Sequence, residues 1–128
     1  MDDLPEFSYS QRHLWANADK ELGVAEVGVT EELFDELEEI LSIDVPMVGD
    51  ELEMDSMCVH FHLHADIYHL RSPLSGRVTE INKTVLDNPN LLHLAPYEHW
   101  LFKMEYDEPD EFEMLMSAVQ YARYLDSL

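Results

Sequence analysis

The sequence is poor in cysteine, lysine and long apolar runs, and each shortage excludes a class of protein. Cys58 is the single cysteine among 128 residues, so no internal disulfide can form and nothing indicates an oxidising compartment. No apolar run approaches the roughly 18 residues that a membrane-spanning helix needs, and the N-terminal Met1-Asp2-Asp3 does not resemble a signal peptide. These absences predict a soluble, cytoplasmic protein.

Basic residues are also scarce. Seven Lys and Arg residues stand against 28 Asp and Glu residues, which gives a formal net charge of −21. Proteins that bind nucleic acid or anionic membranes need a basic patch, so neither class of partner is expected. A basic protein partner fits this charge better. The lysines are Lys20, Lys83 and Lys103, so a stretch of more than 60 residues contains none.

What is present predicts one β-rich domain. The length and the 46% content of apolar residues are typical of a single globular domain with a modest core. We assign residues 9–128 to this domain and residues 1–8 to a flexible acidic leader. Alternating and β-branched apolar residues predict strands, with Trp15 as a core anchor. The expected strands cover residues 8–16, 22–29, 41–45, 77–81 and 100–106, in addition to the hairpin described below.

Two segments have helical spacing instead. Thr30 is a suitable N-cap before the acidic pair at 31–32, and an apolar stripe follows it, which predicts a short helix near residues 30–40. Apolar residues from Phe112 to Ala122 predict a C-terminal amphipathic helix that ends near Leu125. Residues 82–90 are expected to form a polar connection. The predicted fold class is therefore α+β, mostly β.

The most regular pattern is the stretch from residue 59 to residue 76, where two alternating runs meet near Ala65. We interpret it as a β-hairpin, because alternation sends neighbouring side chains to opposite faces of a sheet. One face then carries apolar residues and the other carries histidines. A two-residue turn at 65–66 would place His62 opposite His69, and a turn one residue earlier would place His60 opposite His69. Both registers put His69 on the same face as the first three histidines.

Five segments in order resemble the H protein family of the glycine cleavage system. Residues 9–15 look like that family's Y-x-x-x-H-x-W opening, and residues 27–52 are similar to its V-G-I-T…L-P-x-V-G-D-E-L segment. Residues 72–78 resemble its S-P-x-S-G-x-V turn. Residues 86–92, followed by residues 96–101, resemble its D-x-P-x-L…P-Y…W-L signature. Each motif is short, but their order and spacing over residues 9–125 make the resemblance strong.

The resemblance implies a carrier rather than an enzyme. In this family a lipoyl group on a lysine at a hairpin tip moves between a decarboxylase, a folate-dependent transferase and a flavoprotein. The implied fold is a flattened lipoyl-domain-like barrel or sandwich with the two helical additions predicted here. The implied partners are glycine-cleavage or lipoylation enzymes.

This chain departs from the family where the carrier function lies. The family motif at the tip is E-S-V-K-A-A-S-D, and counting back from Ser72-Pro73 without a gap places its lysine at Ala65. A shift by one residue gives His64 or Asp66 instead. None of these side chains offers the amine that forms the lipoyl amide. We therefore predict that Ala65 is unmodified and that the protein carries no lipoate.

The hairpin histidines suggest a metal as an alternative. Neutral imidazole binds zinc, nickel or copper, and histidines at alternate strand positions lie on one face about 7 Å apart. The candidate ligands are His60, His62, His64 and His69, with His62 and His69 preferred and joined by His60 or His64. The competing interpretation is an exposed or partner-facing stripe. Cys58 is expected to be a small buried residue rather than a ligand, and His13 to have a structural role.

Three hypotheses follow. The first is a non-catalytic binding or adaptor module with the H-protein fold and no lipoate. The second is a metal-binding protein that uses the hairpin face. The third is a true lipoyl carrier whose lysine lies elsewhere in the chain.

Overall fold

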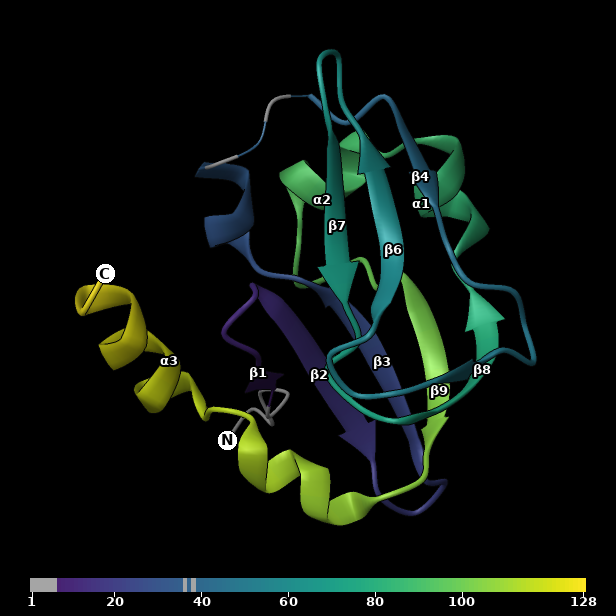
Figure 1. Cartoon of the computed structure of the whole chain (residues 1–128), viewed down its shortest axis with the longest axis vertical. Coiled ribbons are helices and arrows are strands. Elements are labelled where there is room, and N and C mark those ends of the chain that lie inside the picture. The colour runs from purple at the N-terminus through teal and green to yellow at the C-terminus, as the bar shows by residue number, and fades with distance from the viewer. Residues whose placement is uncertain (1–6, 36, 38) are drawn as a thin grey trace.

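Two antiparallel sheets form an open sandwich in the computed structural model, which describes residues 7–35, 37 and 39–128 (Figure 1). One sheet has six strands in the order β1-β2-β3-β9-β8-β5, and the other has three in the order β4-β6-β7. The strands are β1 (Ser8–Tyr9), β2 (Leu14–Asp19), β3 (Val24–Val29), β4 (Ser42–Asp44), β5 (Glu51–Leu52), β6 (Met57–His62), β7 (Ile67–Arg71), β8 (Gly76–Ile81) and β9 (Phe102–Tyr106). The helical segments are the 3₁₀ helices η1 (Glu31–Asp35) and η2 (Pro109–Met114) and the α-helices α1 (Lys83–Asp87), α2 (Asn90–Leu94) and α3 (Ala118–Asp126). The prediction of a mostly-β α+β fold is confirmed.

One apolar core lies between the two sheets. It combines side chains from both of them, among them Leu14, Val27, Val59 and Phe61. Trp15 is 1% exposed, and its Nε1 donates to the carbonyl oxygens of Val29 at 3.0 Å and Pro96 at 3.2 Å. This confirms the predicted core anchor. Gly28 on β3 lies against the indole ring. A Cβ at this position would come too close to a ring carbon, so β3 has no room for a side chain at residue 28.

The N-terminal prediction of one strand over residues 8–16 is wrong. The chain instead forms a hairpin in which β1 pairs antiparallel with β2, with Ser8 opposite Ala16. The Ser10 hydroxyl accepts from the amides of Arg12 and Leu14, both at 3.2 Å, and His13 adopts a positive φ of 66°. These turn features interrupt the apolar pattern without a glycine or proline to signal them. Residues 1–6 of the predicted leader lie outside the described residues, whereas Phe7 stacks on Trp15 with ring centroids 4.6 Å apart.

The predicted C-terminal helix is two helical segments rather than one. Between η2 and α3 the chain extends, and Met116 exchanges backbone hydrogen bonds of 2.8 and 2.7 Å with Tyr9. Ser117 then starts α3 with a capping box that it forms with Gln120. The side chain that α3 buries is Tyr121, whereas the predicted apolar face at Val119 is 63% exposed. In Figure 1, α3 lies beside the sheets rather than over them.

The polar connection predicted over residues 82–90 contains α1 and the first residue of α2. Both helices are only five residues long, so their apolar residues cover barely one turn and give no repeating pattern. Tertiary packing fixes them, because Val85 and Leu92 are fully buried in the common core. The short helix predicted near residues 30–40 is present as η1, and residues 36 and 38 lie outside the described part. No helix among the described residues is long and apolar enough to cross a membrane.

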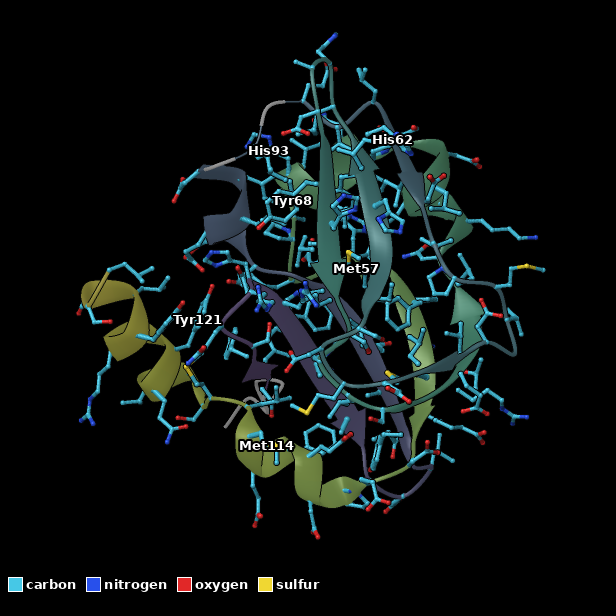
Figure 2. The ribbon with its side chains drawn as sticks, viewed as in Figure 1. Met57, His62, Tyr68, His93, Met114 and Tyr121 are labelled. Carbon is cyan, nitrogen blue, oxygen red and sulfur yellow. The ribbon has the colours of Figure 1, made fainter. Side chains whose placement is uncertain are left out.

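A buried polar network attaches α3 to the sandwich. The Tyr121 hydroxyl lies 2.9 Å from both Thr30 Oγ1 and His13 Nδ1, and the Tyr121 ring stacks on Tyr9 at 4.7 Å (Figure 2). Thr30 is fully buried. Burial raises the pKa of Tyr121, so its hydroxyl keeps its proton and remains a hydrogen-bond donor. The predicted structural role of His13 is consistent with this contact.

We expect Tyr121→Phe to lower the free energy of unfolding by about 1–3 kcal/mol, because it leaves the buried Thr30 hydroxyl without this partner. Urea unfolding followed by circular dichroism measures the change. The matched control is Tyr124→Phe in the same helix. Its hydroxyl donates to the Gln11 carbonyl oxygen at 3.3 Å in an exposed position, so a loss under about 0.5 kcal/mol is expected. Equal losses in the two variants would contradict this role of Tyr121.

Candidate functional site

The β6–β7 hairpin has the second of the two predicted registers. His60 lies opposite His69, and His62 lies opposite Ile67. The Leu63 amide donates to the Asp66 carbonyl oxygen at 2.9 Å and closes the turn. His64 and Ala65 therefore occupy the tip, which projects beyond the rest of the sandwich (Figure 1).

The two faces of the hairpin differ as the alternation predicts. Val59, Phe61 and Leu70 are at most 1% exposed and pack into the core. His60 and His69 lie on the opposite, outward face. A register shift between Met57 and Val59 marks a bulge at the start of β6, and it leaves Cys58 buried at 7% exposure rather than on the histidine face.

Two of the four predicted metal ligands come together. His60 Nδ1 and His69 Nδ1 are 2.6 Å apart, and their rings meet edge to face with centroids separated by 4.8 Å. Since a neutral imidazole has one N–H, one of the two nitrogens donates its hydrogen to the other. The preferred pair of His62 and His69 is not formed, because the turn lies one residue earlier and places His62 opposite Ile67.

The other two histidines have acidic partners. His62 Nε2 lies 2.6 Å from Asp44 Oδ2, and His64 Nε2 lies 3.7 Å from Glu39 Oε1. Within the described residues, no group of three or more His, Cys, Asp or Glu side chains is arranged to hold a metal. The four histidines thus do not form the single cluster that the sequence suggested, because His64 is at the tip and His62 is hydrogen-bonded to Asp44.

Asp44 is a member of the site that the sequence analysis missed. It lies on β4 directly opposite His60, so Asp44, His60 and His69 form one row across all three strands of the small sheet. The alternation of residues 41–45 predicts a strand, but it does not reveal which strand pairs with it. The pairing with β6 is a tertiary feature.

The three lysines lie outside the β6–β7 hairpin, whose tip is occupied by exposed Ala65. Lys20 is in the turn after β2, and Lys83 begins α1. Lys103 is on β9, where its Nζ lies 3.8 Å from both Glu26 and Glu80 and 4.8 Å from the centre of the Trp100 ring. The tip itself offers a methyl group and an imidazole.

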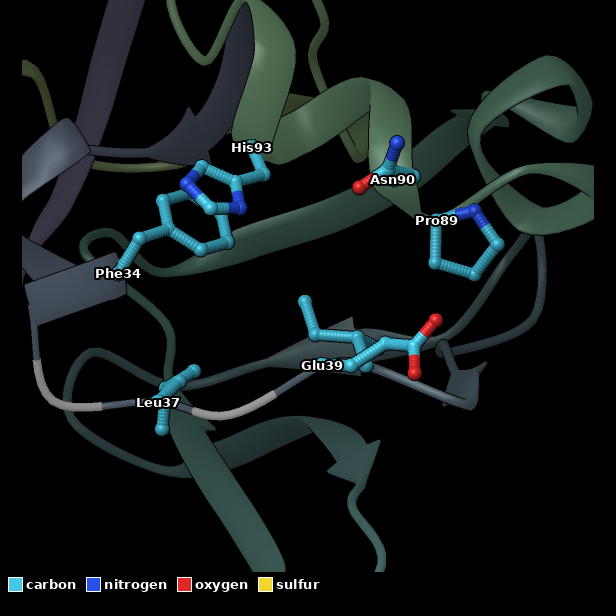
Figure 3. A pocket seen from close by; sticks show the side chains of 7 residues that line it. Phe34, Leu37, Glu39, Pro89, Asn90 and His93 are labelled. Atoms are coloured by element: carbon cyan, nitrogen blue, oxygen red, sulfur yellow. The ribbon is translucent and has the colours of Figure 1, made fainter.

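An open hollow of about 210 Å³ lies between η1 and α2 (Figure 3). Phe34 and His93 stack nearly parallel at one side of it, with ring centroids 4.9 Å apart. Leu37 and Ile40 add apolar surface, and Glu39 connects the hollow to the hairpin tip through its contact with His64. An apolar surface with an acidic margin therefore adjoins the tip.

Comparison of the chain with known proteins identifies its family. A family model described as glycine cleavage H-protein matches residues 7–128. The chain belongs to this family. It is 33% identical over 126 residues to the glycine cleavage system H protein of Streptomyces coelicolor, which covers 97% of this chain and 98% of that protein. It is also 33% identical over 121 residues to the probable glycine cleavage system H protein of Thermococcus gammatolerans, which covers 94% of this chain and 90% of that protein.

The fold comparison agrees. The crystal structure of a glycine cleavage system H protein from Mycobacterium marinum superposes with a TM-score of 0.81 and 24% identity, over 98% of this chain and 100% of that chain. The H-protein-like fold predicted from the sequence motifs is confirmed. One motif glycine of the H-protein turn has a clear steric reason, because a Cβ on Gly76 would lie 2.0 Å from the Glu105 carbonyl oxygen on β9.

Cys58 lies near the histidines in sequence but is chemically protected. Burial raises the pKa of its thiol to about 12, which leaves very little thiolate near neutral pH. We expect iodoacetamide at pH 8 to modify the folded protein at least 100-fold more slowly than the urea-unfolded protein, because the reactive thiolate is both scarce and covered. Intact-mass spectrometry over time measures both rates. Similar rates in the two states would contradict a buried, protonated Cys58.

Proposed function

We propose that this H-protein family member is a non-catalytic docking module that carries no lipoate. The observation that carries the proposal is Ala65 at the hairpin tip, where the family motif has its lysine. Lipoate is attached through an amide to the ε-amine of lysine. A methyl side chain cannot form that bond.

The positions of the three lysines in the chain support this proposal. Lys83 and Lys20 lie on a helix start and on a turn of the six-stranded sheet, not on the β6–β7 hairpin. Lys103 is half-buried between two glutamates, so its amine is engaged within the sheet. A swinging arm needs an attachment point that projects, and none of these three positions resembles the tip.

The residues around the tip add a second argument. Counted from Ala65, the acidic positions of the E-S-V-K-A-A-S-D motif fall on His62 and His69. The chain therefore lacks the lysine and also has imidazoles where the motif has carboxylates. We infer that a lipoate ligase that binds this hairpin would find no amine to modify and would contact imidazoles in place of two carboxylates.

The acidic surface near the tip supports docking. Members of the H protein family act with the enzymes of glycine cleavage, and this chain keeps their fold over nearly its whole length. Glu31 and Asp35 are exposed on η1, and Phe34 from the same segment lines the hollow beside the tip. An apolar hollow with carboxylates at its margin suits a partner that presents an apolar side chain within a basic surface.

Metal binding by the hairpin face is the second candidate function. The contact that favours it is the 2.6 Å approach of the His60 and His69 nitrogens. Zinc, nickel and copper all accept imidazole ligands. The third hypothesis, a true lipoyl carrier, has no comparable observation in its favour and becomes an outcome of the lipoylation test.

We expect the wild-type protein to gain no lipoyl group when incubated with lipoate ligase, lipoate and ATP, because it has no amine at the tip. The Ala65→Lys variant is expected to gain one lipoyl group, and restoring Glu at 62 and Asp at 69 in the same variant should speed the reaction. Intact-mass spectrometry followed by peptide mapping detects the adduct. An H protein with the full motif serves as the positive control for the ligase. A lipoyl adduct on any lysine of the wild-type protein would instead support the third hypothesis, a true lipoyl carrier.

We expect the unmodified, metal-free protein to bind the glycine decarboxylase of its host, because docking depends on the fold and not on lipoate. Reversing two exposed charges on η1, with Glu31→Lys and Asp35→Lys, should weaken binding at least 10-fold and reduce its dependence on salt. Isothermal titration calorimetry at two ionic strengths measures this. The matched control reverses Glu108 and Asp110 at the start of η2, at the end of the molecule opposite the tip (Figure 1). Equal weakening by both double variants, or no binding by the wild type, would contradict the proposed docking face.

A further inference from the structure

We propose that His60 and His69 form a two-nitrogen chelate for a divalent copper ion on the outward face of the β6–β7 hairpin. This inference rests on the second candidate function, metal binding, and is independent of docking. It replaces the four-histidine cluster with one defined pair and selects a metal. His62 and His64 are excluded as primary ligands.

The first support is the distance between the two nitrogens. Two ligands at about 2.0 Å from one metal are separated by about 2.8 Å at a right angle and by about 3.3 Å at a tetrahedral angle. His60 Nδ1 and His69 Nδ1 are already 2.6 Å apart. A widening of about 0.2 Å, with both rings turned so that their Nδ1 lone pairs point at one metal, gives the right-angle arrangement.

The same distance selects the metal. Right angles between neighbouring ligands belong to the square-planar or tetragonal sites of Cu²⁺ and Ni²⁺, whereas Zn²⁺ prefers tetrahedral sites. Copper also binds nitrogen ligands more tightly than nickel or zinc in the order of first-row metals. The geometry therefore favours Cu²⁺ first, Ni²⁺ second and Zn²⁺ last.

The second support is that the backbone fixes the pair. His60 and His69 are direct cross-strand partners, so their Cα atoms are positioned by the β6–β7 ladder. The buried residues Val59, Phe61 and Leu70 hold the other face of the same two strands in the core. A metal bound here joins two strands that are already in register, so little chain ordering is needed on binding.

The third support is the chemistry of the surroundings. The two nitrogens share one hydrogen, so at least one of them is free of a proton and presents a lone pair. A bound metal takes the position of that shared hydrogen, and the donor ring then carries its hydrogen on Nε2, so both Nδ1 lone pairs face the metal while each imidazole stays neutral. His69 is exposed, which leaves the remaining coordination positions open to water.

The local charge favours a cation. Asp44 is in the same cross-strand row, on the other side of His60, and it is the nearest carboxylate in the sheet register. The basic residue closest to His69 along β7 is Arg71, and its Nη1 donates to the Asp55 carbonyl oxygen at 2.7 Å. The whole chain has a formal charge of −21, which raises the local concentration of cations.

The test is a calorimetric titration of untagged, chelator-treated protein with CuCl₂, NiCl₂ and ZnCl₂ in separate runs. We expect one Cu²⁺ per chain, bound more tightly than Ni²⁺ or Zn²⁺. His60→Ala and His69→Ala should each weaken Cu²⁺ binding at least 10-fold. The matched control is His62→Ala, on the same strand and face, which should change the affinity less than threefold because Asp44 already holds His62.

Two further measurements separate the site from a folding effect. Electron paramagnetic resonance of the Cu²⁺ complex should show two equivalent nitrogen ligands in the wild type and one in either single variant. Thermal unfolding without metal should be the same for His60→Ala and His62→Ala, whereas added Cu²⁺ should stabilise only the second.

The outcomes distinguish this chelate from metal binding in general. Copper binding that survives in the His60→Ala and His69→Ala variants but is lost in His62→Ala or His64→Ala would overturn the chelate and keep the metal-binding function. No binding by the wild-type protein would overturn both. Neither result affects docking, which is measured on metal-free protein.

Discussion

The structure depends on the burial of one face of the β6–β7 hairpin against the larger sheet. Val59, Phe61 and Leu70 have almost no exposed surface, and burying side chains of this size stabilises the fold by roughly 1.5–3 kcal/mol each. In a strand with a period of two residues, this burial fixes the other face as well. The histidines at alternate positions must then point outward. A shift of one residue in either strand would place imidazoles in the core and phenylalanine in water.

The same constraint explains why the tip can differ from the family while the fold does not. The family turn at residues 72–76 is held by its own contacts, with the Ser75 amide and hydroxyl donating to the Glu111 carboxylate at 2.7 and 2.8 Å. The tip at His64 and Ala65 contributes no buried side chain. Its residues are therefore free of packing requirements, and a lysine can be replaced there without a cost in stability. Belonging to the H protein family shows the fold, whereas carrying lipoate needs one particular amine.

Docking and metal binding use separate parts of the molecule on either side of the hairpin tip. The proposed docking face lies beside the tip, where η1 and the hollow next to α2 present carboxylates and apolar surface. The proposed copper pair, His60 and His69, lies on the outward face of the two strands. It is the next cross-strand pair on that face after His62 and Ile67, farther from the tip. His62 and His64, which engage Asp44 and Glu39, lie between the two regions. The proposed metal pair and the proposed docking face share no side chain, so a bound metal leaves the docking face open.

The sequence by itself determined the strands of the hairpin, the mostly-β class, the family and the absence of a lysine at the tip. These features follow from local patterns: alternation over Val59–Leu63, the order of short motifs, and the identity of residue 65. The sequence did not determine the turn at His13, the division of the C-terminal helix at Ser117, or the two five-residue helices. Each of these is set by backbone partners distant in the chain, such as the bonds between Tyr9 and Met116. The choice between His60 and His62 as the partner of His69 was likewise decided by tertiary structure. A two-residue turn at 64–65 satisfies the same alternation as one at 65–66, and the closing contact between Leu63 and Asp66 selects the first.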